Sequence, residues 1–261
     1  MKPILLLGAG RMGGALIAGW RRVGAFEPDQ LMIRDPEPGA EALASGALID
    51  PDPAAIGRAQ TVLLMVKPQI WREVAASVAP HLAPEAVIVS IAAGVAAANI
   101  ASAFGGRRVA RVMPTTAVAI GQGTASIFSN DAEARRRARA MFGAVGVVVD
   151  LADEDQMHTA TAVSGSAPAY LYAFVEALEA AGVALGLDAD VARNLARATT
   201  AGAAALMADS GGDAADLRRQ VTSPGGTTEA ALKVLMGEAG LGPLLKEAAK
   251  AAEQRSLELG K

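Results

Sequence analysis

The first of two glycine-rich segments carries a clear chemical signal. Gly8-Ala9-Gly10-Arg11-Met12-Gly13 follows the aliphatic run Ile4–Leu7 and precedes a helical stretch. In this arrangement the first glycine allows a tight turn, the second lets the backbone approach a pyrophosphate, and the third lets the helix pack against the strand. The N-terminus of the helix adds unpaired N–H groups for phosphate oxygens. The segment therefore predicts a dinucleotide site with contacts from Leu7 to Gly13.

The second glycine-rich segment lies late in the chain. Thr222-Ser223-Pro224-Gly225-Gly226-Thr227-Thr228 leads directly into another helical stretch. A threonine at this place can cap the helix, and the first N–H groups of the helix are then available to an anion. The segment predicts a site for a small carboxylate or phosphate. The alternative is a simple helix cap joined by a Pro-Gly turn.

Three further groups of residues stand where expected strands end. In an open α/β sheet, ligands bind beyond the carboxyl ends of the strands. Lys67 at such an end can hydrogen-bond a nicotinamide ribose, or it is an ordinary surface lysine, and the small turn at 92–94 leaves room for a nicotinamide ring. The rim residues expected to contact the dinucleotide are Met65, Val66, Lys67, Pro68, Ala92, Ala93, Gly94, Met113 and Pro114.

Arg34 and Asp35 end the second expected strand, where the residue that recognises the adenosine ribose belongs. An acid at this place bonds the ribose 2′-hydroxyl and repels a 2′-phosphate, whereas an arginine favours the phosphate. The sequence offers both residues, so NAD and NADP both remain open. Each side chain is otherwise an ordinary solvated loop charge.

The elements that must position these residues follow from the hydrophobic pattern. Short aliphatic runs alternate with helical stretches over residues 1–150, which predicts βαβ units and a largely parallel, doubly wound sheet. The expected strands are Ile4–Leu7, Leu31–Arg34, Thr61–Val66, Val87–Ile91, Arg108–Val112, Ala125–Ser129 and Val147–Leu151. The expected helices are Met12–Val23, Gly39–Ser45, Ile70–Ala79 and Ala132–Phe142.

From Asp153 onward the pattern changes to helices alone. Long Ala- and Leu-rich stretches at 169–185, 189–209 and 244–259 have apolar residues at helical spacing. The sequence therefore predicts two domains, a dinucleotide-binding domain of residues 1–152 and a helical domain of residues 153–261. Apolar helices in a small domain usually need a partner chain to cover them, so we expect a homo-oligomer.

Composition excludes several classes of function. The 261 residues are 52% hydrophobic and 20% charged, and they carry a formal net charge of −3, which leaves no basic footprint for nucleic acid or an anionic membrane. No cysteine is present, and two separated histidines make a metal site unexpected. The apolar runs are interrupted by glycine and polar residues, so we expect a soluble, cytoplasmic protein without a membrane span.

Taken together and in this order, the motifs resemble those of the pyrroline-5-carboxylate reductase family over essentially the whole chain. The segments that carry the resemblance are Gly8–Gly13, Val66–Pro68, Ser90–Val95, Arg111–Pro114, Ser164–Tyr170 and Val221–Thr228. The resemblance implies a Rossmann-type domain followed by an all-helical dimerisation domain. It also implies reduction of a cyclic imine carboxylate to L-proline with NADP or NAD, with NADP favoured, by homodimers that can assemble into a ring of dimers.

The resemblance also implies roles for individual residues. The Thr228 hydroxyl, at the final threonine of the family signature, would hydrogen-bond the ring nitrogen of the imine, which makes it the expected catalytic residue. The substrate carboxylate would lie against the loop formed by Ser223, Gly225, Gly226, Thr227 and Thr228. The nicotinamide would lie over 92–94, near 113–114. Glu154 would favour the cationic imine, or it is a solvated acid at a helix start.

Some positions depart from the family pattern, and two other functions compete with the reductase. The first glycine loop carries Arg11 where the family has Asn, and the acid that usually precedes the second loop is displaced to Asp213, whose role stays open. A β-hydroxyacid dehydrogenase would use a lysine early in the second domain, but no lysine lies between Lys67 and Lys233. A dinucleotide sensor without turnover would not need the anion loop at 223–228.

Overall fold

The computed structural model describes residues 1–260 and forms two compact units. The N-terminal unit comprises Met1–Gly165 together with residues 252–260, and the helical unit comprises Ser166–Ala251. No helix within residues 1–260 combines the length and the apolar content that a bilayer span requires.

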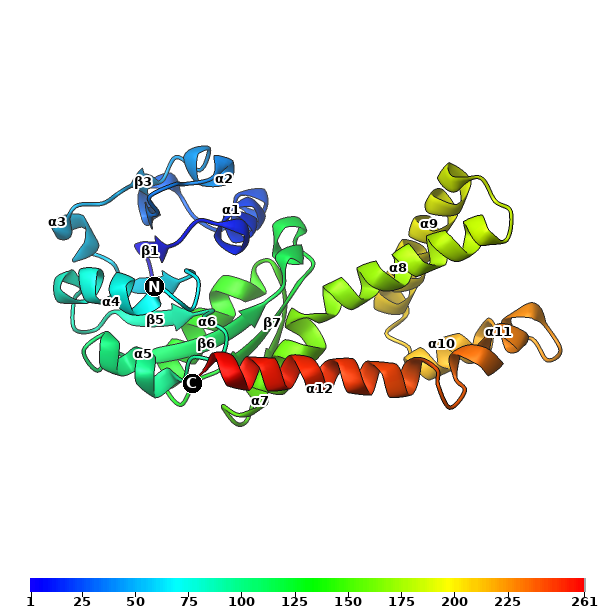
Figure 1. Ribbon diagram of the computed structural model, residues 1–261. Coiled ribbons are helices and arrows are strands. Elements are labelled where there is room, and N and C mark those ends of the chain that lie inside the picture. The colour runs from blue at the N-terminus through cyan, green and yellow to red at the C-terminus, as the bar shows by residue number, and fades with distance from the viewer. Residues whose placement is uncertain (261) are drawn as a thin grey trace. The chain divides into compact units, whose positions relative to one another are not determined.

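Within residues 1–260 the N-terminal unit holds one eight-stranded sheet, in the order β3-β2-β1-β4-β5-β6-β7-β8 (Figure 1). The strands are β1 (Ile4–Leu7), β2 (Leu31–Arg34), β3 (Leu48–Ile49), β4 (Thr61–Leu64), β5 (Val87–Ser90), β6 (Val109–Pro114), β7 (Gly123–Phe128) and β8 (Gly146–Asp150). Neighbouring strands are parallel except for β6 and β7. The chain winds from β1 out to β3 and then from β4 in the opposite direction, which confirms the expected doubly wound sheet.

Two layers of helices cover the sheet because its strands are apolar on both faces. Alternate residues of β1 show this, since Leu6 packs in one cluster with α1 and α6, whereas Leu5 and Leu7 pack in the other with α3, α4 and α5. The helices of this unit are α1 (Arg11–Val23), α2 (Ala40–Leu43), α3 (Pro53–Ile56), α4 (Trp71–Val78), α5 (Ala97–Ala103), α6 (Ala132–Gly143) and α7 (Gln156–Ala160).

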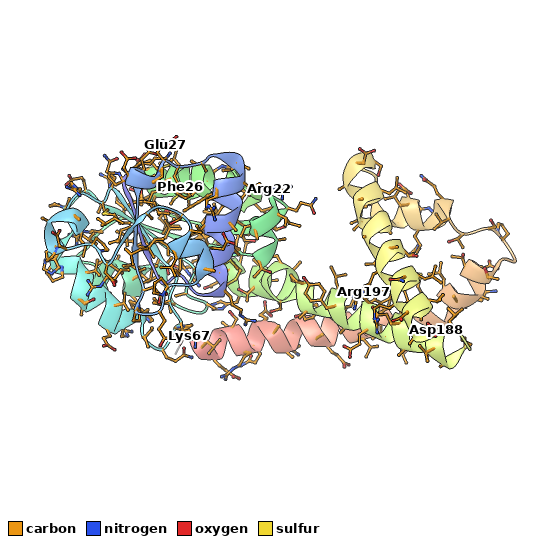
Figure 2. All side chains as sticks on the ribbon, turned by 90° about the horizontal axis from the view of Figure 1, so that it is seen from above. Arg22, Phe26, Glu27, Lys67, Asp188 and Arg197 are labelled. Atoms are coloured by element: carbon orange, nitrogen blue, oxygen red, sulfur yellow. The ribbon has the colours of Figure 1, made fainter. Side chains whose placement is uncertain are left out.

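Aromatic packing closes one side of this unit. Trp20 on α1 meets Phe26, labelled in Figure 2, edge to face with ring centroids 6.0 Å apart, and its indole N–H donates to the carbonyl of Met141 at 2.8 Å. Figure 2 shows the side chains of this unit gathered densely around the sheet. The bond ties the C-terminal end of α1, the helix that follows the glycine turn, to α6.

The helical unit contains α8 (Ala167–Ala184), α9 (Ala189–Ser210), α10 (Ala214–Gln220), α11 (Thr227–Leu235) and the first part of α12 (Leu241–Leu259). Helices α8 and α9 pack as a pair, joined by an ion pair between Glu179 and Arg197 at 2.8 Å (Figure 2). Asp213, the displaced acid, caps α10 by accepting from the Ala215 N–H at 2.7 Å. The structure thereby gives Asp213 a local structural role.

The helical unit leaves much of its apolar surface uncovered in the single chain. Helix α8 has no buried residue, and Tyr172 and Leu185 are 71% and 88% exposed. The other exposed large apolar side chains on α8, α9 and α11 are Leu171, Phe174, Leu178, Val183, Val191, Leu195, Leu206, Met207, Val234 and Leu235. Exposed apolar patches of this extent mark interaction surfaces.

The two compact units do not divide the chain at the expected boundary between residues 152 and 153. The division falls after Gly165, because that glycine packs against Met113 of β6 so closely that an added Cβ would lie 2.9 Å from the Met113 sulfur. The last turns of α12 also return to the N-terminal unit, where Ser256 bonds His158. A sequence pattern shows where strands give way to helices, but it does not show which helices pack on the sheet.

Candidate functional site

The glycine turn after β1 has the geometry that a dinucleotide needs. Gly8 has φ of +94°, and an added Cβ would lie 2.8 Å from Cγ1 of Val66, while a Cβ on Gly13 would lie 2.4 Å from the Gly8 carbonyl oxygen. Packing of the protein itself therefore requires the first and third glycines. A Cβ on Gly10 would meet nothing within 4 Å. The second glycine thus faces open space, which fits close approach of a pyrophosphate.

The N-terminus of α1 is free to bind an anion. Gly10 occupies the N-cap position without a side-chain cap, and the first turn contains no acidic residue. The N–H groups of the first turn, at 11–13, make no backbone hydrogen bond within residues 1–260. Uncapped N–H groups and the helix dipole together favour a phosphate at this point.

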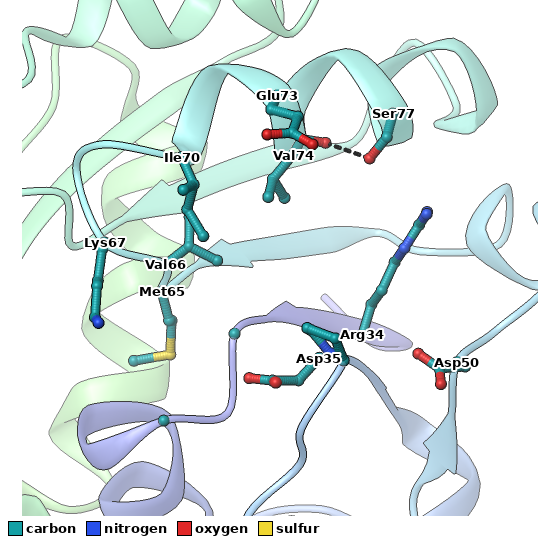
Figure 3. A pocket seen from close by; sticks show the side chains of 13 residues that line it. Arg34, Asp35, Asp50, Met65, Val66, Lys67, Ile70, Glu73, Val74 and Ser77 are labelled. Atoms are coloured by element: carbon teal, nitrogen blue, oxygen red, sulfur yellow. Dashed lines mark hydrogen bonds between the residues drawn. The ribbon is translucent and has the colours of Figure 1, made fainter.

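A cavity of about 730 Å³ opens beside the glycine turn, at the carboxyl ends of β1, β2 and β4 (Figure 3). Its size falls within the range of small-molecule and cofactor sites. It is lined by Gly8, Gly10, Arg34, Asp35, Pro36, Asp50, Met65, Val66, Lys67, Ile70, Glu73, Val74 and Ser77. The cavity lies between β1 and β4, where the order of the strands reverses its direction across the sheet. Ligands usually bind at this point in such sheets.

Seven of the residues expected to bind the dinucleotide line this cavity, namely Gly8, Gly10, Arg34, Asp35, Met65, Val66 and Lys67. Ala9 and Arg11 line a second hollow of about 590 Å³ that shares Gly10 with the first. Leu7 and Gly13 are buried, and Met12 packs against the hydrophobic core. Any contact of these three residues with a ligand would therefore come from their backbone atoms.

One wall of the cavity consists of residues that were not among the expected site residues. Helix α4 and the residue before it supply Ile70, Glu73, Val74 and Ser77, which recur at helical spacing and so form one face. Their helical spacing is the feature of the sequence that could have indicated this wall. Asp50 gave no signal, because it follows the two-residue strand β3, which was not expected, and only the fold brings it beside β2.

The two candidate adenosine residues point in different directions. The carboxylate of Asp35 turns back to the glycine loop, where Oδ2 accepts from the Ala9 N–H at 2.5 Å and Oδ1 accepts from the Glu37 N–H at 2.8 Å. Figure 3 shows Arg34 extending across the cavity toward Ser77, away from Asp35. Arg34 forms no ion pair within residues 1–260. The structure therefore presents a free cation to the cavity.

The remaining rim residues lie farther along the same edge of the sheet and do not line the cavity. Ala92 and Gly94 are buried in the turn after β5, Ala93 is half-buried beside them, and Met113 and Pro114 are the last residues of β6 rather than part of a loop. Pro68 follows Lys67 and is half-buried. Because β4, β5 and β6 are parallel, their carboxyl ends follow one another along this edge.

Glu154, an expected substrate ligand, forms two hydrogen bonds within the N-terminal unit. Its Oε1 accepts from the Ala97 N–H at 2.6 Å, at the first residue of α5, and from Nη1 of the buried Arg111 at 2.9 Å. The carboxylate therefore caps α5 and neutralises Arg111. Both bonds end on Oε1, so a contact of this side chain with the substrate imine stays a prediction.

The second glycine loop differs from expectation in how its helix is capped. Gly226, and not a threonine, is the N-cap of α11, and no side chain caps it. The Gly225 N–H donates to Oε2 of Glu229 at 2.9 Å, and the Gly226 N–H donates to the Ser223 carbonyl at 3.0 Å. The N–H groups left without a backbone partner are those of 227–229. The Thr228 hydroxyl has no hydrogen bond within residues 1–260 and is thus available to a ligand.

Comparison with known proteins agrees with both halves of the chain. Residues 154–259 match the family model described as pyrroline-5-carboxylate reductase dimerisation, and residues 3–94 match the one described as NADP oxidoreductase, coenzyme F420-dependent. The pyrroline-5-carboxylate reductase of Pseudomonas aeruginosa is 40% identical over 266 residues, which cover 98% of this chain and 96% of that protein.

Solved structures give the same result. A pyrroline-5-carboxylate reductase from Coxiella burnetii superposes with a TM-score of 0.90 at 31% identity, covering 100% of this chain and 99% of that one. The pyrroline carboxylate reductase of Plasmodium falciparum, solved with NADP bound, has a TM-score of 0.85 at 25% identity and covers 99% and 98%. Relatives this similar over their full length favour the reductase over the β-hydroxyacid dehydrogenase. The chain belongs to the pyrroline-5-carboxylate reductase family, the oxidoreductases that catalyse the last step of proline biosynthesis.

Proposed function

We propose that this chain reduces L-1-pyrroline-5-carboxylate to L-proline with a dinucleotide held along the carboxyl edge of its sheet. The observation that carries the proposal is the uncapped N-terminus of α1 beside Gly10, which opens on the cavity of about 730 Å³. When bound, a reduced nicotinamide supplies the hydride. The protein's own contribution is to bind and orient both reactants.

We propose NADP as the preferred coenzyme, with NAD as the alternative. Arg34 enters the cavity without an ion-pair partner among residues 1–260, and both oxygens of Asp35 accept backbone N–H groups. A guanidinium suits a 2′-phosphate because it can form two parallel charged hydrogen bonds. The family model matched by residues 3–94 and the NADP-bound relative from Plasmodium falciparum support this preference.

The pyrophosphate, the nicotinamide ribose and the nicotinamide ring would lie one after another along the carboxyl edge of the sheet. The N–H groups of Arg11–Gly13 would hold the pyrophosphate, and Lys67, exposed and without an ion pair in the described part of the chain, would bond the nicotinamide ribose. The turn at 92–94 and the end of β6 at 113–114 come next along the edge. We place the nicotinamide ring there, because these small or apolar side chains leave a face free of competing charge.

Substrate binding is assigned to the loop before α11. The carboxylate of the imine would accept from the N–H groups of 227–229, which have no backbone partner within residues 1–260. The Thr228 hydroxyl would bond the ring nitrogen. Ser223, exposed at the start of the loop, and Gly225, with φ of +73°, shape its approach. A protonated imine is already electrophilic, so positioning matters more than a strong acid.

We further propose that residues 153–261 act as one functional region for dimerisation and substrate binding. The dimerisation family model matches 154–259, and the exposed apolar faces of α8 and α9 are the surface a second copy would cover. Assembly into a ring of dimers and a cytoplasmic location rest on family membership alone.

The direct test mixes purified protein, pyrroline-5-carboxylate and each reduced coenzyme and follows the loss of nicotinamide absorbance. We expect formation of L-proline at the rate of coenzyme oxidation, with a higher kcat/KM for NADPH. Tight NADPH binding without turnover would instead identify a dinucleotide sensor. Equal or better use of NADH would overturn the assignment of Arg34.

A further inference from the structure

The turn at Ala92–Gly94 is in direct contact with the end of the C-terminal helix α12 and with the residue that follows it. Gly94 has φ of +79°, and a Cβ added to it would lie 2.7 Å from the Gly260 nitrogen and 2.8 Å from the Ser256 carbonyl oxygen. The contact is reciprocal, because a Cβ added to Gly260 would lie 2.3 Å from the Gly94 carbonyl oxygen. Two glycine backbones therefore meet with no side chain between them.

Hydrogen bonds from α7 fix this end of α12 in place. Nδ1 of His158 and Oγ of Ser256 lie 2.9 Å apart, and Ser256 is buried. One residue along, the Thr159 hydroxyl donates to Glu253. Both bonds join α7 to α12, so the last turns of α12 cannot shift relative to α7 without breaking them.

The other end of the same turn is held by the residue that precedes α7. Glu154 accepts from the N–H of Ala97, which begins α5 directly after the turn, and from Arg111 on β6. The segment 154–159 therefore makes two sets of contacts. It bonds the 92–97 stretch at Ala97, and it bonds the end of α12 that contacts Gly94. Such supporting contacts are what hold a reacting geometry within a fraction of an ångström.

We propose that the last two turns of α12 position the Ala92–Gly94 turn against the nicotinamide ring, with Gly260 and Ser256 as positioning residues. The inference rests on the proposed placement of the ring along the edge after β5. It assigns to the C-terminal segment a role in the reduction itself. The reason is geometric, since Gly94 and Gly260 are in direct backbone contact.

The test is the variant Gly260→Ala. Its Cβ must move about 1 Å to reach the ordinary contact distance of 3.4 Å from the Gly94 oxygen, and misplacement of that size can lower a rate by roughly 10- to 100-fold. We expect kcat to fall in that range, with an increased isotope effect for coenzyme deuterated at the transferred position. Ser256→Ala, which loses the bond to His158, should show a smaller fall in the same direction.

Binding measurements separate a local effect from misfolding. 2′-Phospho-ADP-ribose lacks the nicotinamide, so its affinity should stay within about twofold of wild type in Gly260→Ala, whereas NADPH affinity should fall. The matched control is Gly143→Ala at the end of α6, where an added Cβ makes only an ordinary contact at 3.8 Å from Val148. That variant should behave as wild type.

Two results would overturn the inference. One is wild-type kcat and NADPH affinity in Gly260→Ala, and the other is an equal loss of affinity for NADPH and for 2′-phospho-ADP-ribose, which would mean general damage. If the wild-type protein does not reduce pyrroline-5-carboxylate, the proposed function fails, but the ratio of the two affinities still decides the inference.

Discussion

The Ala9 N–H donates to Oδ2 of Asp35 at 2.5 Å, so the glycine-rich turn after β1 is tied to the residue that follows β2. This bond turns the one acidic candidate for ribose recognition toward the protein backbone. Its neighbour Arg34 is then the side chain that extends into the cavity (Figure 3). The proposed coenzyme preference rests on the opposite directions in which the side chains of Arg34 and Asp35 point.

Replacing Arg34 with Ser should weaken NADPH selectively. Loss of a charged hydrogen bond to a 2′-phosphate costs about 1.5–3 kcal/mol, so KM for NADPH should rise roughly 10- to 100-fold. KM for NADH should change little, because NADH carries no 2′-phosphate. The matched control is Arg22→Ser, which removes an exposed positive charge at the end of α1 (Figure 2). Equal effects on both coenzymes would contradict the assignment.

Replacing Thr228 with Val should lower kcat/KM for the imine about 10- to 100-fold, the equivalent of 1–3 kcal/mol for one lost hydrogen bond. Thr227→Val is the control, since it removes the neighbouring exposed hydroxyl and keeps the same backbone N–H. Steady-state kinetics with NADPH at saturation measure both. Unchanged kinetics in the Thr228 variant would remove this hydroxyl from the reaction.

Replacing Glu154 with Gln tests whether this residue is structural. Arg111 is 4% exposed, and loss of its charged partner leaves a buried group less well compensated, so the free energy of unfolding should fall by about 1–3 kcal/mol. Urea denaturation measures this loss. KM for the imine should remain at the wild-type value, whereas a large rise in KM without loss of stability would restore Glu154 to the substrate site.

His158 should make stability depend on pH. Burial, and then the nearby charge of Arg111, lower the pKa of His158 below its usual 6.5, although Asp155, Glu253 and Glu154 act in the opposite direction. Below pH 6.5 the unfolded chain therefore binds more protons at this residue than the folded chain does, and stability falls as pH decreases.

The variant His158→Asn isolates that contribution. Denaturation at pH 7.5 and pH 5.5 should show a smaller loss of stability on acidification than in wild type. An identical pH dependence in the variant and in the wild-type protein would exclude His158 as its source.

Much of the fold could be predicted from residue patterns because its signals are local. The β1 strand, the glycine turn and α1 were all indicated by consecutive residues, and their bounds agree with the structure to within one residue. Strand β3 was missed because two residues give no periodic signal. The prediction that a threonine caps α11 was wrong. Threonine and glycine both suit an N-cap, and only the path of the backbone decides between them.

By itself, the sequence determined the doubly wound sheet, the two glycine loops and the family, since each depends on residue types at short, fixed spacing. Tertiary structure alone decided that Glu154 bonds Ala97 and Arg111, that α4 walls the cavity, and that Gly260 meets Gly94. The physical reason is sequence separation. Such contacts join residues far apart along the chain, and their partners are chosen by how the layers pack, which no local pattern encodes.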